Sequence, residues 1–283
     1  MKVNIAIKEA VMFLKNSMIA SYNLDAKILM THVLNVNSQD LILKYQDSLL
    51  TSQNYQKYLD LIKLRVNRVP ISHLINRREF YNNEFFVNEN VLDPRPDSEA
   101  LIEMMHKKYS SDSLINLCEI GCGSGCLIIT LLKIFKNWNG VAIDISNDAI
   151  DVAKKNAKTH DVFDKINFVN SNIFANIPDK TFDIIISNPP YIPTNDIDNL
   201  QDEVRLYEPK IALDGGLDGL NFYRQISQQS KNYLNKSGKI FVEIGFNQFN
   251  DVKNIFLQNN YILTDFNRDI NNIIRAVEFT NNN

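Results

Sequence analysis

The chain has 283 residues, of which 45% are hydrophobic and 22% charged, and its formal net charge is −3. This length favours one large domain with a small one, and the composition is that of a globular protein with a sizeable core. No run approaches the roughly eighteen apolar residues of a membrane span, and the N-terminus lacks an apolar signal core. We therefore expect a cytoplasmic protein that does not enter membranes.

The charge is distributed unevenly along the chain. Residues 1–80 contain eleven Lys and Arg against six Asp and Glu, a net +5, whereas residues 81–283 contain 19 against 27, a net −8. This balance argues against direct, sequence-specific nucleic-acid binding. The positive N-terminal part could still meet an acidic or RNA-bound partner.

The three cysteines, Cys118, Cys122 and Cys126, fall within nine residues. Their odd number argues against a disulfide framework. Their spacing could suggest a metal site, but no histidine or fourth cysteine lies near, so we expect no bound metal.

Apolar residues recur at helical spacing through the N-terminal part of the chain. The pattern predicts helices over residues 4–18 and 26–34, with Asp25 as a candidate N-cap of the second. A third helix is expected after Ser38 and a fourth after Thr51. Four short helices would form a small bundle.

A basic cluster follows the bundle and would be either a solvated face or a partner-docking patch. Its members are Lys63, Arg65, Arg68, Arg77 and Arg78. Residues 79–87 then predict a β-hairpin around Asn82-Asn83. We therefore divide the chain into a helical domain (1–75), a hairpin and proline-rich linker (76–96) and an α/β domain (97–283).

Residues 92–99, Leu-Asp-Pro-Arg-Pro-Asp-Ser-Glu, predict a rigid extended segment before a helix that begins near Asp97 or Ser98. From residue 114 onward, strands and helices alternate, which predicts a parallel sheet covered by helices. The expected strands are 115–120, 140–145, 166–170, 183–187 and 239–244, and the expected helices are 125–136, 147–159, 219–235 and 247–258. Segments 261–267 and 273–279 are candidate closing strands, an antiparallel pair at the sheet edge.

The stretch Ser187-Asn-Pro-Pro-Tyr-Ile-Pro193 follows the strongest apolar run. Its prolines hold the Asn188 amide and the Pro189 carbonyl with little freedom, and Tyr191 supplies a flat face. Two acceptors beside an aromatic ring would clamp a planar –NH2 group. The alternative is a proline-rich turn that merely ends a strand.

The segment Glu119-Ile-Gly-Cys-Gly-Ser-Gly125 follows a predicted strand and opens a predicted helix. Its glycines let the backbone approach a ligand at a helix N-terminus, which is typical of a nucleotide pocket. Asp144 ends the next strand, where an acidic side chain can accept both ribose hydroxyls. The alternative for Asp144 is an N-cap, but Ser146 is already placed for that role.

Asn172 and Ile173 follow the third predicted strand, where a nucleobase would reach. The Asn172 side chain could bond an adenine edge and Ile173 could pack on its face. These residues, the glycine-rich loop, Asp144 and the Asn-Pro-Pro-Tyr motif all lie at C-terminal strand ends, the edge where open α/β sheets bind ligands. One pocket can hold them all.

These motifs carry a resemblance to a known family. Asn188-Pro-Pro-Tyr191 with Glu119-x-Gly-x-Gly-x-Gly125 looks like the S-adenosylmethionine-dependent methyltransferases that modify planar nitrogens. Three further segments restrict this resemblance to one family of methyltransferases. They are Arg78-Glu-Phe-Tyr, the proline-rich segment that begins at Leu92, and Glu208-Pro-Lys-Ile-Ala-Leu-Asp-Gly-Gly-Leu-Asp-Gly219. With these, nearly the entire chain is similar to the release-factor glutamine methyltransferases, PrmC/HemK.

The resemblance implies a Rossmann-like class I methyltransferase domain and an N-terminal domain that recognises the substrate. It implies S-adenosylmethionine as the cofactor and, as the acceptor, the glutamine side-chain amide in the Gly-Gly-Gln motif of peptide chain release factors. By position, the cofactor would contact Gly121, Cys122, Gly123, Ser124, Gly125, Asp144, Asn172, Ile173 and Asn188. The glutamine would contact Asn188, Pro189, Pro190 and Tyr191, with Asn188, Pro189 and Tyr191 as the catalytic residues.

Three segments of the chain depart from the family's pattern. Asp93 stands where an apolar residue is expected, and Asn76 stands where glycine is expected before the hairpin. Asn172 and Ile173 stand where the family more often has aspartate followed by a large apolar or aromatic residue.

We interpret the Asn188 side chain and the Pro189 carbonyl as acceptors for the two amide N–H groups, with Tyr191 packed on the amide plane. Two alternatives stay open. A DNA or RNA adenine amino-methyltransferase would use the same clamp, but it would need a basic groove. A catalytically silent adaptor with the same fold would fail to bind S-adenosylmethionine. We expect a monomer whose partners are release factors.

Overall fold

The computed structural model describes residues 1–177 and 180–281, and the chain splits into two compact units. The first unit comprises Met1–Arg77 and Gln201–Tyr207, and the second comprises Arg78–Leu200 and Glu208–Asn283. The hairpin and the proline-rich segment therefore belong to the second unit. The sequence did not indicate that residues 201–207 would join the first.

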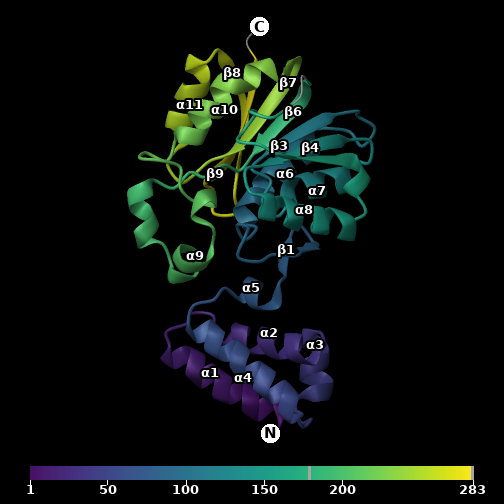
Figure 1. Cartoon of the computed structure of the whole chain (residues 1–283), viewed down its shortest axis with the longest axis vertical. Helices are drawn as coiled ribbons and strands as arrows, with labels where there is room; N and C mark the ends of the chain where they lie inside the picture. Colours follow the sequence, from purple (N-terminus) through teal and green to yellow (C-terminus); the bar gives the residue numbers. More distant parts are fainter. Residues whose placement is uncertain (178–179, 282–283) are drawn as a thin grey trace. The chain divides into compact units, whose positions relative to one another are not determined.

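The first unit is built from short helices, of which α1, α2 and α4 lie side by side (Figure 1). Its elements from the N-terminal part are α1 (Val3–Asn16), α2 (Tyr22–Leu34), α3 (Ser38–Asp40), a π-helical turn (Leu41–Tyr45), α4 (Ser52–Val66) and α5 (Ile71–Ile75). The four predicted helices are confirmed, and α5 is an addition. Thr51 caps α4, because its side chain accepts a hydrogen bond from the Asn54 backbone N–H.

Asp25 is not the N-cap of α2, so that prediction is wrong. The helix begins at Tyr22, and Asp25 lies inside it, almost fully buried. Its carboxylate accepts hydrogen bonds from Arg65 Nε at 2.7 Å and from Ser21 Oγ at 2.8 Å. Because the carboxylate is used in this ion pair, it is not available to the helix N-terminus.

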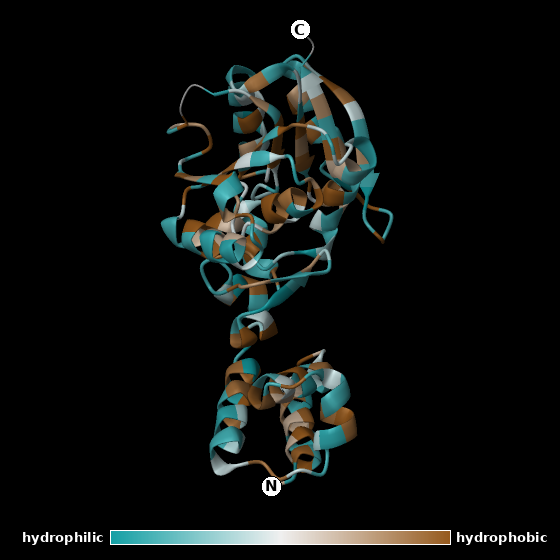
Figure 2. Ribbon diagram, turned by 90° about the vertical axis from the view of Figure 1, so that its right-hand side faces the viewer, coloured by the Kyte–Doolittle hydropathy of each residue, from teal (hydrophilic) through white to brown (hydrophobic). Residues whose placement is uncertain are grey.

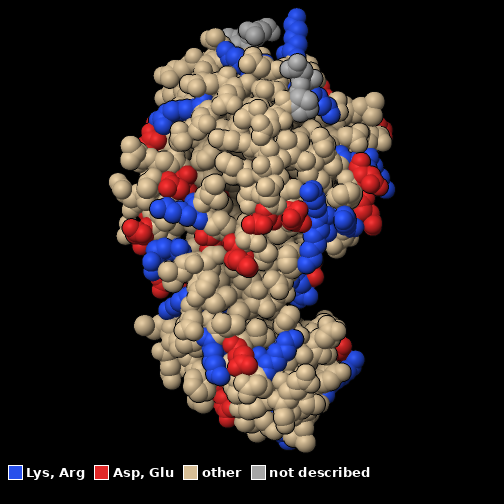
Figure 3. Space-filling view, viewed as in Figure 1, with Lys and Arg blue, Asp and Glu red and all other residues tan. Residues whose placement is uncertain are grey.

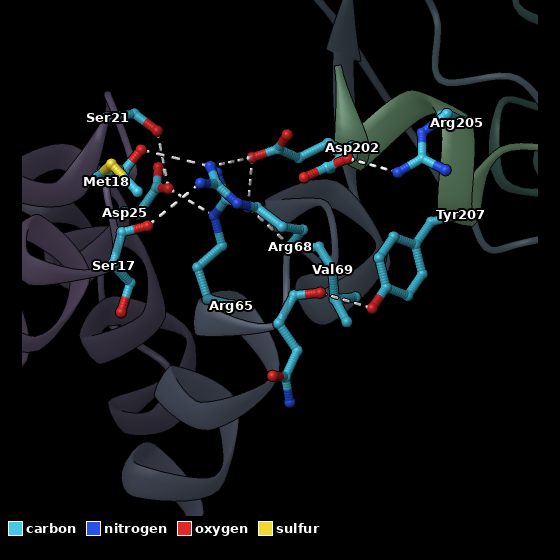
Figure 4. A network of polar contacts seen from close by, with 12 residues as sticks. Ser17, Met18, Ser21, Asp25, Arg65, Arg68, Val69, Asp202, Arg205 and Tyr207 are labelled. Atoms are coloured by element: carbon cyan, nitrogen blue, oxygen red, sulfur yellow. Dashed lines mark hydrogen bonds and ion pairs between the residues drawn. The ribbon is translucent and has the colours of Figure 1, made fainter. Parts of the chain in front are cut away.

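The segment Gln201–Tyr207 joins the first unit through polar contacts with the end of α4 (Figure 4). It contains helix α9 (Asp202–Tyr207). Arg65 Nη1 lies 3.1 Å from a Glu203 carboxylate oxygen, and the Tyr207 hydroxyl donates to the Asn67 carbonyl at 2.6 Å. Arg65 is 6% exposed, so this member of the basic cluster is neither a solvated face nor a docking patch.

The second unit begins with the predicted hairpin, formed by β1 (Arg78–Phe80) and β2 (Asn83–Phe85). The turn residues are Tyr81 and Asn82, one position earlier than predicted, and both have positive φ, 46° and 57°. Two such residues match the twist of antiparallel strands. Asn76, where glycine was expected, also has a positive φ of 51°, a conformation that glycine adopts readily.

The rest of the second unit is a seven-stranded sheet in the order β5-β4-β3-β6-β7-β9-β8. Its strands are β3 (Asn116–Ile120), β4 (Asn139–Asp144), β5 (Ile166–Asn170), β6 (Phe182–Ser187), β7 (Leu234–Glu243), β8 (Tyr261–Arg268) and β9 (Ile274–Asn281). Its α-helices are α6 (Glu99–Lys108), α7 (Cys126–Ile134), α8 (Asn147–Thr159), α10 (Asn221–Gln229) and α11 (Phe249–Gln258). Strands β3 to β7 pair in parallel, whereas β9 pairs antiparallel with β7 and β8, which confirms the predicted closing pair at the sheet edge.

Helices cover both faces of this sheet. Successive side chains of β6 point to opposite faces and are apolar, so both faces must be covered. Ile184 and Ile186 pack in one core cluster with residues of α6, α7 and α8, whereas Ile185 packs in another with residues of α10 and α11. Figure 2 shows hydrophobic residues running along these strands and helices. No helix of the described ranges, 1–177 and 180–281, is long and apolar enough to cross a membrane.

One predicted helix is too long. The pattern predicted helix 219–235, but α10 ends at Gln229 and β7 begins at Leu234. The buried Ser230 hydroxyl bonds the Ile226 carbonyl and the Tyr261 hydroxyl, and a 3-10 turn follows over Ser230–Asn232. Only the bond to Tyr261 joins distant parts of the chain, and the apolar spacing alone does not show it or the end of the helix.

Candidate active site

A cavity of about 350 Å³ lies in the second unit, at the C-terminal ends of β3, β4 and β6. A cavity of this size suits a small-molecule ligand. Its lining includes residues 121–124 of the glycine-rich loop, Asp144, Asn172, Ile173 and residues 187–190, but not Gly125, so the structure brings most of the predicted site residues together. The sheet edge explains this, because the carboxyl ends of parallel strands meet there.

The glycine-rich loop connects β3 to α7 at one end of the cavity. Gly121, Gly123 and Gly125 have φ values of +71°, +51° and +78°, which side chains rarely adopt. A Cβ atom on Gly121 or Gly123 would meet nothing within 4 Å, whereas one on Gly125 would lie 2.9 Å from Ile129 Cδ1. The first two glycines therefore leave room for a ligand, and the third lets the helix pack closely. Cys122 and Ser124 line the cavity beside them.

Asp144 lies at the end of β4 and ties the loop to the sheet. Its Oδ2 accepts a hydrogen bond from the Gly123 backbone N–H, and its Oδ1 accepts one from the Ser146 N–H, both at 2.9 Å. Burial raises the pKa of this carboxyl. As predicted, Ser146 is the N-cap of α8, where its side chain accepts from the Ala149 N–H at 3.2 Å. Asp144 therefore lines the cavity with a carboxylate that does not cap the helix.

Asn172 and Ile173 follow β5 and line the same cavity. Ile173 is buried, and its φ of 52° is unusual for a β-branched residue. Strained backbone conformations persist where the surrounding structure holds them in place, and they are frequent at functional sites. The position of these two residues beside Asp144 suits a contact with the far end of a nucleoside, which stays a prediction.

Asn188 and Pro189 follow β6 at the other end of the cavity. The preceding residue, Ser187, is fixed by a hydrogen bond from its hydroxyl to the Ile120 carbonyl at 2.8 Å. Asn188 Nδ2 donates to Ser98 Oγ at 3.0 Å. Among the described residues, neither Asn188 Oδ1 nor the Pro189 carbonyl oxygen accepts a hydrogen bond. Two acceptors are therefore open beside the cavity.

Tyr191 lies behind this pair, and it is not among the residues that line the cavity. Its ring packs against an apolar core cluster, and its hydroxyl donates to Glu243 Oε1 at 3.4 Å. Its carbonyl accepts from Gln248 Nε2 at 3.0 Å. A Cβ on Gly219 would lie 2.3 Å from that same carbonyl, so a residue with no side chain is required there. Contacts with Gly219, Glu243 and Gln248, all later in the sequence, thus fix Tyr191 of the Asn-Pro-Pro-Tyr motif in place.

Several of these supporting residues were not predicted as site residues. Arg95 Nη2 bonds both carboxylate oxygens of Glu208 at 2.7 Å, and Arg95 lines the cavity. Burial, opposed by Arg95, raises the pKa of Glu208 to about 7. Both residues lie in the segments that carry the family resemblance, a signal that could have found them. Asp93, which departs from the family's pattern, is buried and pairs with Arg78 at 3.7 Å.

Comparison with known proteins identifies the family. The PrmC N-terminal domain model matches residues 6–75, and the methyltransferase small domain model matches residues 86–203. A release factor glutamine methyltransferase of Clostridium acetobutylicum is 33% identical over 279 residues, which cover 98% of each chain. The chain belongs to the release factor glutamine methyltransferase family.

Other relatives differ in length or share only the fold. A bifunctional methyltransferase of Rickettsia bellii is 35% identical over 283 residues, which cover 91% of this chain and 51% of the relative. The chain therefore spans about half the length of such relatives. A methyltransferase from Pyrococcus furiosus has a TM-score of 0.53 and 18% identity, over 71% of this chain and 90% of that one. The second unit thus has the Rossmann-like fold of class I methyltransferases, as predicted.

Proposed function

We propose that the protein transfers a methyl group from S-adenosylmethionine to the side-chain amide nitrogen of the glutamine in the Gly-Gly-Gln motif of peptide chain release factors. The name of the full-length Clostridium relative supports a glutamine acceptor. The proposal rests mainly on the two open acceptors beside the cavity, Asn188 Oδ1 and the Pro189 carbonyl oxygen. A primary amide matches them, because it presents two N–H donors on one planar nitrogen.

The residues at the other end of the cavity fit the cofactor. The open space beside Gly121 and Gly123 admits a ligand close to the backbone, and the Asp144 carboxylate can accept ribose hydroxyls. Asn172 and Ile173 would contact the adenine. When bound, S-adenosylmethionine supplies a methyl group on a sulfonium sulfur, which keeps the bonding electron pair as the methyl leaves.

The chain's own part in the reaction is to position a weak nucleophile. The lone pair of an amide nitrogen is delocalised, so the nitrogen attacks poorly unless it is held in place. If Asn188 Oδ1 and the Pro189 carbonyl accept both N–H groups, the face of the amide plane is turned toward the methyl carbon. As the new N–C bond forms, the nitrogen becomes positive and the two oxygens stabilise it. One N–H proton then leaves to water, and no side-chain base is required.

The first unit is the candidate recognition domain for the release factor. A flexible tripeptide cannot supply the contact area that selective protein recognition needs. This unit contains residues 6–75, which match the PrmC N-terminal domain. A nucleic-acid acceptor is disfavoured by the net charge of −8 over residues 81–283. On the face drawn in Figure 3, basic and acidic side chains are interspersed.

Methyl transfer from labelled S-adenosylmethionine tests the proposal. The acceptors are an intact release factor, the same factor with the Gly-Gly-Gln glutamine changed to alanine, and duplex DNA. We expect label on the intact factor alone. Label on DNA would mean that the Asn188 clamp reads a base, and absence of both label and cofactor binding would favour a silent adaptor.

A further inference from the structure

The side chain of Gln248 joins three segments that meet at the Asn-Pro-Pro-Tyr motif. Its Nε2 donates hydrogen bonds to the Tyr191 carbonyl at 3.0 Å and to the Gly219 carbonyl at 3.3 Å. Its Oε1 accepts a hydrogen bond from the Gly245 backbone N–H at 2.9 Å. Gln248 is the N-cap residue of α11, but its side chain does not cap that helix. Both ends of this carboxamide are therefore bonded to backbone groups outside the helix.

A carboxamide matches the backbone groups that surround the end of this side chain. Two carbonyl oxygens there need donors, and one N–H group needs an acceptor. A carboxamide supplies both, because its nitrogen carries two N–H donors and its oxygen accepts. An apolar side chain of the same length would leave all three backbone groups without this partner. An ionised glutamate would bond the N–H group but direct a second oxygen at the two carbonyls.

Two glycines make room for the Gln248 carboxamide. A Cβ atom on Gly219 would lie 2.8 Å from Gln248 Nε2, and one on Gly245 would lie 2.7 Å from its Oε1. The Gly245 Cβ would also lie 3.0 Å from Cδ2 of the Tyr191 ring. A larger residue at either position would therefore displace the amide from its bonds.

The Tyr191 carbonyl is connected to the open acceptors of the cavity by a stiff stretch of backbone. Pro190 separates Tyr191 from Pro189, and two consecutive prolines leave few backbone rotations between them. Before the motif, the Ser187 hydroxyl is bonded to the Ile120 carbonyl, which fixes the other side. A shift of the Tyr191 carbonyl should consequently move the Pro189 carbonyl oxygen as well.

We propose that Gln248 is a positioning residue that holds the Pro189 carbonyl oxygen toward the acceptor nitrogen. The inference rests on the proposed function, in which that oxygen accepts an N–H of the glutamine amide. Gln248 is not among the residues that line the cavity, so it acts through the backbone of residues 189–191 and not through contact with the substrate. Its three hydrogen bonds do not involve the glycine-rich loop, so the cofactor should bind normally without them.

The kinetic test is single-turnover methyl transfer from saturating labelled S-adenosylmethionine to a release factor, with the full chain. Gln248→Met fills a similar space without hydrogen bonds and should lower the rate about tenfold, with the cofactor Kd within about twofold. Gln248→Glu, ionised at about pH 8, should lower the rate at least as much. A wild-type rate in folded Gln248→Met would overturn the proposal, as would a rate and an affinity that fall in the same proportion.

Asn259→Asp is a matched control that separates positioning from a loss of stability. The Asn259 side chain is half-buried in the same unit, outside the cavity lining. Its Nδ2 donates to Ser227 Oγ and to the Ile255 carbonyl, both at 3.0 Å. The substitution replaces this donor with a carboxylate oxygen, so it should lower stability but leave the transfer rate and the cofactor Kd unchanged. If it slows transfer as much as Gln248→Met does, Gln248 has no specific positioning role.

A carbonyl signal reports the positioning without any turnover. Pro189-Pro190 is the only pair of consecutive prolines in the sequence. Protein labelled with proline that carries 13C in its carbonyl group and 15N in its ring therefore gives one NMR correlation between a carbonyl carbon and the nitrogen bonded to it. This correlation belongs to the Pro189 carbonyl, and it should move in Gln248→Met but not in Asn259→Asp.

The carbonyl signal also keeps this inference separate from the proposed function, because it is measured on the protein without substrate. An unmoved signal in Gln248→Met would overturn the inference. A wild-type protein that methylates no release factor would instead overturn the proposed function, while the signal still decides whether Gln248 holds the Pro189 carbonyl.

Discussion

The two ends of the cavity are built in different ways. The end that we propose for the cofactor is made largely of backbone: three glycines with positive φ and an N–H group held by Asp144, all within residues 121–144. The end that we propose for the acceptor combines the Pro189 carbonyl with the Asn188 side chain. The hydrogen bonds around it join Asn188 to Ser98, 90 positions away in the sequence, and Tyr191 to Glu243, 52 positions away. A local motif therefore suffices to form the first end, whereas the second depends on the complete fold. Substitutions at the two ends should consequently fail in different ways.

The largest effect is expected from Asn188→Ala. Removing the Oδ1 acceptor should lower kcat by about 10²–10³-fold, as for the loss of one oxyanion-type hydrogen bond. The measurement is single-turnover methyl transfer at saturating cofactor. Asn235→Ala is a matched control, because its amide bonds Asp183 in the same unit and lies outside the cavity lining. A near-normal rate in Asn188→Ala would remove Asn188 from the mechanism.

The acceptor end should also make stability depend on pH. Burial raises the pKa of Glu243 to about 7. A carboxyl with a raised pKa stabilises the folded state below its unfolded pKa, and this contribution is lost as pH rises through the folded value. Between pH 4.5 and 8 the free energy of unfolding of the wild type should fall by about 3 kcal/mol relative to Glu243→Gln. Urea unfolding at several pH values measures this difference, and parallel curves would contradict it.

Two glycines of the loop are expected to be required for different reasons, Gly125 for packing and Gly123 for cofactor binding. Gly125→Ala places a Cβ 2.9 Å from Ile129 Cδ1 and 3.2 Å from Ala153 Cβ at a φ of +78°. It should lower the free energy of unfolding by about 2 kcal/mol or more, through strain and overpacking. Gly123→Ala has open space and should lower stability by about 1 kcal/mol, while its methyl group obstructs the cofactor. Thermal unfolding with and without S-adenosylmethionine compares the two variants; equal loss of stability would contradict this division.

The smallest effect is expected from Asp144→Asn. Loss of one charge-assisted hydrogen bond to the ribose should weaken cofactor binding about tenfold, with little change in rate at saturation. Equilibrium binding of S-adenosylmethionine gives the Kd. Asp148→Asn removes the same charge from an exposed site four residues on and should leave the Kd unchanged. A large fall in kcat for Asp144→Asn would contradict the assignment of this residue to cofactor binding alone.

The local structure of the end that we propose for the cofactor could be predicted from the sequence, because its determinants lie close together in the chain. The glycine pattern, the strand that ends at Asp144 and the Ser146 cap can each be recognised within a few residues. The open acceptors of Asn188 and Pro189 were also expected from the prolines beside them. The parallel sheet covered by helices followed from the alternation of strands and helices, and the class I fold was implied by the family resemblance.

The parts that sequence did not predict depend on contacts between distant segments. Nothing near Ser98 in the chain indicates a bond to Asn188, and the apolar spacing of α10 does not show that Ser230 ends the helix. Arg65 was assigned to an exposed basic cluster, but Asp25 and Glu203 bury it in the first unit. These pairings are chosen by the folded structure and cannot be recovered from periodicity.

The most direct test of the central claim is to measure cofactor Kd and single-turnover rate together for Asn188→Ala and Asp144→Asn, with an intact release factor as the acceptor. We predict that Asn188→Ala transfers methyl slowly with a nearly normal Kd, and that Asp144→Asn binds the cofactor weakly but transfers at a nearly normal rate once saturated. If both variants lose rate and affinity in the same proportion, the two ends of the cavity do not have separate roles, and the account is wrong.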